Sequence, residues 1–169
     1  MTNTAIAKPA ITLEELLAFA DESARNWLRF LDAQPAVQQL PCAIFNTGTV
    51  PGLVRHIFAV EFRFAKRLAG QPVPPYASMP DGPLPVLTAL HDEAVAQFRV
   101  LLADSSQDWN ETIEWVTLTA GTIHASRRKM FAHPLFHAVR HWAQLASLAR
   151  AAGFPPPFPG DLLVSDALA

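Results

Sequence analysis

The segment HPLFHAVRHWAQ (133–144) carries three histidines spaced four residues apart, His133, His137 and His141. Residues four apart on an α-helix share one face, each one turn above the last. Imidazole nitrogens at positions i and i+4 can therefore reach one metal ion at about 2.0–2.1 Å, as in helical zinc sites. The segment predicts part of a metal site, which a histidine from a neighbouring helix would complete with a third nitrogen.

His56 is the candidate for that third ligand. It follows Leu53 by three residues and precedes Val60 by four, which places it on the apolar stripe of its own helical pattern. His137 and His141 also lie on an inward-facing stripe, so all three imidazoles are expected to meet in one core. Burying imidazoles without partners is unfavourable, and a divalent cation removes that penalty. The alternative is that these histidines are core or hydrogen-bonding residues that bind no metal.

Two further residues are predicted to support the site. His133 lies close to Pro134 and the helix start, where a hydrogen-bonding role behind the ligands suits it better than coordination. Gln144 follows His141 by three residues on the same stripe and is placed to steady a ligand or a bound water.

Other ionisable residues are assigned elsewhere. Glu61 comes five residues after His56, about 500° of helical rotation, so it faces about 140° away and is expected at the surface or in a supporting position. His91 precedes two acidic residues and is expected to be exposed to solvent. For His124 the sequence leaves two positions open, toward the cavity or toward the outside.

Composition limits the kind of site and partner. Cys42 is the only cysteine, which excludes an internal disulfide framework and a thiolate-rich metal site, and agrees with a reducing, cytoplasmic location. A net charge of −2 without a long basic block argues against nucleic acid as a partner. No apolar run approaches the roughly 20 residues that span a membrane, and the N-terminus lacks the pattern of a secretory signal. The 169 residues suit one domain, 1–169.

Apolar residues at helical spacing predict an all-α fold of four long helices. The first spans 13–33, the second 50–69, the third runs through 86–102 and the fourth spans 127–152. Pro134 would either kink the last helix or mark its first turn.

The segments between the helices contain turn-forming residues. Residues 34–48 and the proline-rich stretch 71–83 are expected to be irregular connections. Within 111–126, ETIEWVTL and TIHAS flank an Ala-Gly turn and predict a small hairpin before the last helix. The proline-rich tail, 154–169, is expected to pack back loosely or to fray.

The histidine segment resembles the C-terminal motif of the DinB/YfiT-like superfamily, in which histidines recur every four residues and an Arg-Gly-Gln sequence follows. The segment VRHIFAVEFRFAKRL (54–68) is similar to that family's second helix, where an acidic residue follows a histidine. This chain has Trp142 and Ala143 in place of the arginine and glycine, Arg140 where another histidine often occurs, and keeps Gln144.

The resemblance implies a four-helix bundle, frequently a homodimer, with a divalent metal, zinc or nickel, held by His56, His137 and His141. Some members are metal-dependent thiol transferases, which makes an S-transferase or related hydrolase acting on a thiol or other small molecule one hypothesis. A non-catalytic, metal-stabilised interaction module is the other, and enzymatic status stays open. Ala138 stands where a helical zinc protease needs glutamate, so peptidase activity is not predicted.

Overall fold

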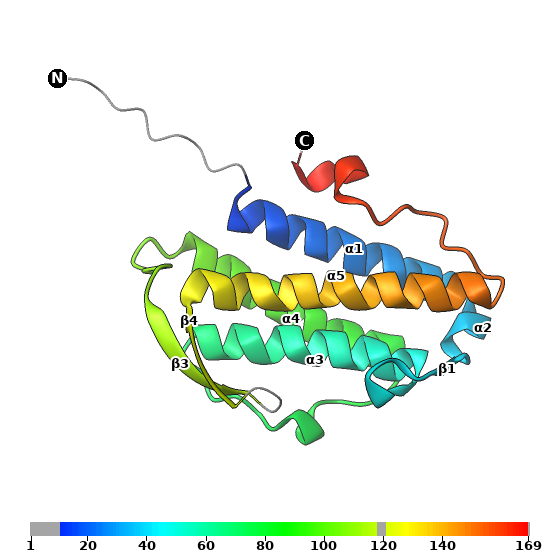
Figure 1. Cartoon of the computed structure of the whole chain (residues 1–169), viewed down its shortest axis with the longest axis horizontal. Helices are drawn as coiled ribbons and strands as arrows, with labels where there is room; N and C mark the ends of the chain where they lie inside the picture. The colour runs from blue at the N-terminus through cyan, green and yellow to red at the C-terminus, as the bar shows by residue number, and fades with distance from the viewer. Residues whose placement is uncertain (1–10, 118–120, 169) are drawn as a thin grey trace.

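A computed structural model describes residues 11–117 and 121–168 of the chain. Four long helices lie alongside one another (Figure 1): α1 (Leu13–Ala33), α3 (Val50–Leu68), α4 (Leu84–Ala103) and α5 (Arg127–Ala151). Each of α1 and α3 packs against both α4 and α5, so α1 and α3 lie across a diagonal of the bundle. The predicted all-α four-helix bundle is confirmed. Within the described ranges, no helix combines the length and the apolar character needed to cross a membrane.

Side-chain caps set where three of these helices begin. At the start of α1, the Glu15 backbone N–H donates to Thr12 Oγ1 at 3.1 Å and the Thr12 N–H donates to the Glu15 carboxylate at 2.7 Å, a complete capping box. Thr49 caps α3 and Ser126 caps α5 in the same way, through one hydrogen bond each. These caps satisfy backbone donors that have no partner within the helix, and they explain why the predicted starts agree with the structure.

Pro134 lies inside α5, which begins seven positions earlier at Arg127. The helix therefore runs through the proline, and the alternative that Pro134 marks the first turn is wrong. The Pro134 side chain is buried, so packing of the apolar ring compensates in part for the backbone hydrogen bond that proline cannot donate.

A hairpin precedes α5, as predicted. Strand β3 (Thr112–Thr117) pairs antiparallel with β4 (Gly121–Ser126), with Trp115 opposite Ile123. The first residue of the predicted Ala-Gly turn lies outside the described residues. Trp115 packs on Phe64 of α3 at 4.2 Å between ring centres. The hairpin therefore covers one end of the bundle beside α3 (Figure 1).

The segment between α1 and α3 contains more structure than its sequence indicated. It forms a four-residue helix α2 (Pro35–Gln38) and two short antiparallel strands, β1 (Pro41–Cys42) and β2 (Gly48–Thr49). The proline-rich connection 71–83 is irregular as predicted, apart from a single 3₁₀ turn at Tyr76–Ser78.

The C-terminal tail packs back along α1 (Figure 1). Phe158 contacts Trp27 edge to face at 5.3 Å, and the Ser165 hydroxyl donates to the Glu22 carboxylate at 2.6 Å. Trp27 in turn stacks on Trp142 at 5.6 Å, and both indoles are buried. The two tryptophans are core residues that join α1, α5 and the tail.

Candidate metal centre

Three histidines converge where α3 packs against α5. The Nε2 atom of His137 lies 3.1 Å from Nε2 of His56 and 3.1 Å from Nε2 of His141. One ring nitrogen from each residue falls within 4.8 Å of the other two. Nitrogen ligands of a tetrahedral zinc ion lie about 3.3–3.4 Å apart, given zinc–nitrogen bonds of about 2.0–2.1 Å. The donor set and its spacing fit a divalent ion, and coordination itself stays a prediction.

The helix geometry explains the convergence. His137 and His141 are one turn apart on the face of α5 that meets α3, and His56 faces them from α3. His56 and His141 are buried, while His137 is partly exposed. In the described part of the chain, no further histidine, cysteine, aspartate or glutamate joins this group.

Contacts on the far side of two rings orient the Nε2 atoms inward. His141 Nδ1 lies 2.7 Å from the Gln144 side-chain oxygen, and an amide oxygen only accepts, so Nδ1 carries the proton and Nε2 keeps its lone pair. His56 Nδ1 lies 3.0 Å from the Tyr76 hydroxyl. These contacts correspond to the outer partners that hold metal-binding imidazoles in other proteins.

The environment keeps the histidines neutral. Burial, with the charge of Arg140 acting in the same direction, lowers the pKa of His56 to about 4 and that of His137 to about 3. Burial also lowers the pKa of His141, although the hydrogen bond to Gln144 acts against it. At neutral pH the three rings are therefore in the deprotonated form that a metal ion requires.

The family model of the DinB superfamily matches residues 48–145, which run from the start of α3 into α5 and include His56, His137 and His141. The chain belongs to the DinB superfamily. Comparison of the chain with curated proteins gives no match.

His133 borders the three-histidine group of this DinB-superfamily protein without joining it. Its ring stacks on Phe64 at 5.1 Å, and its centre lies 6.2 Å from that of His137. Its described contacts are ring contacts, so the hydrogen-bonding role predicted for it stays a prediction. His124 is on the outside of the hairpin, where Nε2 lies 3.8 Å from a Glu114 carboxylate oxygen and both side chains are well exposed.

Two aromatic residues at the site were missed by sequence reasoning. Tyr76 belongs to the proline-rich connection, which Arg55 holds against α3 by donating to the backbone carbonyls of Tyr76, Met79 and Pro80. Connections of this kind have no periodicity from which a contact can be predicted. The one available signal was an isolated aromatic residue among prolines.

Phe45 is the second aromatic residue at the site that sequence reasoning missed. Its ring stacks on the His56 imidazole at 4.3 Å, although 58% of the residue is exposed. Its backbone has φ 49°, a left-handed conformation that costs a bulky residue of order 1–3 kcal/mol. The pairing of β1 with β2 brackets the residue and holds it in this position. Phe45 thus covers one face of a candidate ligand.

His91 is buried, which corrects the expectation that it is exposed. Only 1% of the residue is accessible; Nδ1 lies 2.7 Å from Glu61 Oε2 and Nε2 lies 3.1 Å from Asp21 Oδ1. His91 follows Leu87 by one helical turn and shares its inward face, whereas the acidic residues after it are rotated toward solvent. The acidic neighbours in the sequence were therefore a misleading guide.

Glu61 likewise is not at the surface, since only 2% of it is exposed. The predicted rotation away from His56 is consistent with the structure, because Glu61 contacts His91 of α4 and His56 contacts His137 of α5. The surface expectation failed because α3 packs against two helices, so its second face is also buried.

His91 carries a positive charge at neutral pH. Burial by itself lowers its pKa, but the charge of Glu61 and the hydrogen bonds with Asp21 and Glu61 outweigh burial and raise the pKa to about 9. The hydrogen bond from His91 is the largest influence on Asp21, whose pKa falls to about 2. Arg25 and Arg99 also pair with Asp21. This group, the His91 network, joins α1, α3 and α4.

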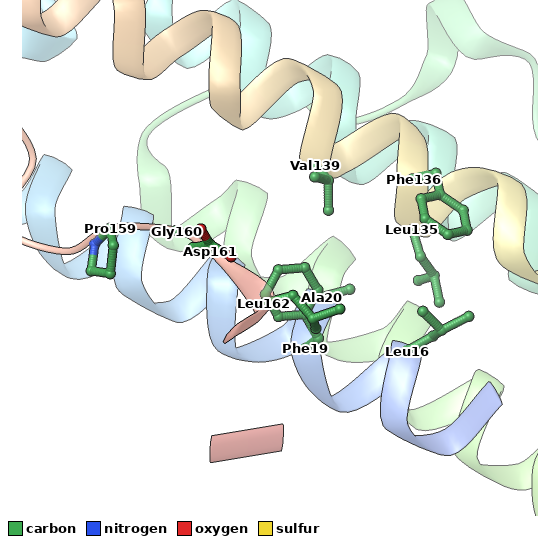
Figure 2. A pocket seen from close by; sticks show the side chains of 10 residues that line it. All are labelled: Leu16, Phe19, Ala20, Leu135, Phe136, Val139, Pro159, Gly160, Asp161 and Leu162. Atoms are coloured by element: carbon green, nitrogen blue, oxygen red, sulfur yellow. The ribbon is translucent and has the colours of Figure 1, made fainter. Parts of the chain in front are cut away.

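A surface groove of about 390 Å³ is lined by no residue of the three-histidine group or of the His91 network. It runs between α1, α5 and the C-terminal tail, and Figure 2 shows Leu16 and Phe19 of α1 facing Leu135 and Val139 of α5. The lining is largely apolar, so the groove offers no candidate catalytic group beyond Asp161 at its tail side.

Proposed function

We propose that this protein holds one divalent ion, zinc or nickel, through the Nε2 atoms of His56, His137 and His141, and acts as a metal-dependent S-transferase or related hydrolase. The observation that carries the proposal is the 3.1 Å spacing of the Nε2 atoms on two packed helices. Membership of the DinB superfamily supports it. Nitrogen ligands do not separate zinc from nickel reliably, so availability decides which ion is bound.

A bound ion would supply Lewis acidity, which lowers the pKa of a thiol or water enough to give a nucleophile near neutral pH. The chain contributes three nitrogen donors, and within residues 11–117 and 121–168 no fourth acidic, cysteine or histidine side chain joins them. The fourth coordination position of the ion would therefore be available to a small-molecule substrate. Tyr76 contacts the His56 ring and Gln144 contacts the His141 ring, and these contacts hold the two imidazoles in place.

The test is metal content per chain, measured by elemental analysis on untagged protein. We expect about one ion per chain in the wild type and loss of the ion in His56→Ala and His137→Ala. His124→Ala is the matched control, because His124 is a histidine exposed on the hairpin and should leave the metal content unchanged. A wild-type protein that stays metal-free after incubation with zinc and nickel would exclude the proposal.

The reaction is tested separately on metal-loaded protein. A panel of low-molecular-weight thiols with electrophilic acceptors should show thiol consumption by the wild type and none by His137→Ala. Metal binding at one ion per chain, without turnover of any pair, would favour the second candidate function.

That second candidate is a non-catalytic interaction module, stabilised by the metal and acting as a homodimer. The apolar groove favours it, because Phe136 at its edge is 61% exposed and Leu163 of the adjoining tail is 90% exposed. Light scattering should give twice the chain mass for the wild type and the single-chain mass for Phe136→Asp.

We also propose a cytoplasmic location, because the single cysteine, Cys42, is free and suits a reducing compartment.

A further inference from the structure

Arg140 lies against the three-histidine group. It immediately precedes His141 on α5, and its Nη2 atom comes within 3.3 Å of His141 Nε2. Because Nδ1 of His141 carries the ring proton, this Nε2 is an acceptor and the guanidinium donates to it. Arg140 therefore points a charged donor at the atom that would bind the metal.

The charge around this group is positive. Arg140 lies 3.3 Å from His141, and Arg55 is next to His56 on α3 and donates to the backbone of Tyr76, whose hydroxyl contacts His56. Within the described residues, Arg140 makes no ion pair, whereas Arg25, Arg99 and Arg127 each pair with a carboxylate. Arg140 thus adds a positive charge that no described carboxylate pairs with.

A metal ion would increase this imbalance. It would use the His141 lone pair that accepts from Arg140, leaving the guanidinium without that acceptor next to a dication. A negatively charged donor atom bound to the ion would offset both charges and accept the free N–H groups, and hydrogen bonds between charged partners are the stronger ones. A neutral ligand would not offset the charge.

We propose that Arg140 makes this centre selective for an anionic ligand, such as a thiolate or carboxylate, by donating hydrogen bonds to it at the open coordination position. The inference rests on the proposed metal site and names the charge class of its substrate. Arg140 acts here as a binding residue, and the three histidines act as the metal ligands.

The experiment uses Co²⁺-loaded protein, whose visible absorption changes when a ligand enters the coordination sphere. Azide is the anionic probe and imidazole the neutral probe, and each is titrated into wild type, Arg140→Gln and Arg140→Lys. In Arg140→Gln we expect the azide dissociation constant to rise about tenfold and that of imidazole to change by less than about twofold. Arg140→Lys, which keeps the charge, should show a smaller loss for azide.

Arg150→Gln is the matched control, because Arg150 is an exposed arginine in the last turn of the same helix, and it should leave both constants unchanged. Equal azide affinity in wild type and Arg140→Gln, or equal losses for both probes, would overturn the inference while the Co²⁺ spectrum still demonstrates the metal site. A wild-type protein that takes up no Co²⁺ would overturn the metal site and the inference together.

Discussion

His91 and Glu61 form a buried pair in which the His91 Nδ1–H donates to Glu61 Oε2 at 2.7 Å. The second nitrogen of the same ring donates to Asp21, so one imidazolium joins carboxylates from two other helices. With both ring nitrogens occupied, His91 has no lone pair for a metal ion. The His91 network is thus a structural group, distinct from the three histidines at the interface of α3 and α5.

Removing His91 should destabilise the fold strongly. His91→Ala leaves the Glu61 carboxylate buried without its partner, which typically costs about 3–5 kcal/mol in the free energy of unfolding. Urea unfolding measures this change. The control is Asp92→Asn, which breaks a more exposed pair with Arg25 and should cost less than about 1 kcal/mol. Similar losses in the two variants would contradict a special role for the buried pair.

The His91 network should also give stability a defined pH dependence. Since folding raises the pKa of His91 to about 9, its contribution is complete below the unfolded pKa of about 6.5 and is lost as the pH rises through 9. The groups that face it are Asp21 and Glu61, with Arg25 and Arg99 behind Asp21.

The measurement is the difference in unfolding free energy between wild type and His91→Gln from pH 6 to pH 10. This difference should fall by roughly 3 kcal/mol between pH 6.5 and pH 9. A difference that stays constant over this range would mean that His91 is not charged in the folded protein.

Gln144 should set metal affinity through His141. Gln144→Leu removes the acceptor 2.7 Å from His141 Nδ1, and loss of such an outer partner typically weakens metal binding about 10–100-fold. Gln144→Glu keeps an acceptor and should bind at least as tightly as the wild type. Competition with a chromophoric chelator measures both constants, and unchanged affinity in the leucine variant would count against this role.

Phe45 should limit access to the metal from the side of His56. Because its ring covers that imidazole at 4.3 Å, Phe45→Ala is expected to speed the removal of metal by a chelator several-fold. Phe136→Ala is the control, since Phe136 is similarly exposed but lines the apolar groove between α1 and α5. Equal extraction rates in the two variants would show that Phe45 does not shield the site.

Much of the bundle could be read from local sequence. The helix starts at residues 13, 50 and 127 follow from caps at Thr12, Thr49 and Ser126, which are short-range interactions between residues three positions apart. The positions of His137 and His141 on one face follow from helical spacing alone. These features depend on a few neighbouring residues, so the pattern of the chain contains the information.

The contacts between segments could not be read in this way. Phe45 and Tyr76 reach His56 from irregular connections whose path depends on the β1–β2 pairing and on the hydrogen bonds from Arg55. Helical spacing indicates which way His91 and Glu61 point relative to their neighbours, and it carries no information about which helix covers that face.

By itself, therefore, the sequence determined the four helices, the starts of three of them, and the three histidines that could share one ion. Only the tertiary structure decided which faces are buried, because burial depends on the helices packed around each residue. It buried His91 and Glu61 against each other on the second covered face of α3 and brought His56 of α3 next to His137 of α5. Local periodicity operates over one or two turns, whereas these contacts join residues brought together by the packing of whole helices.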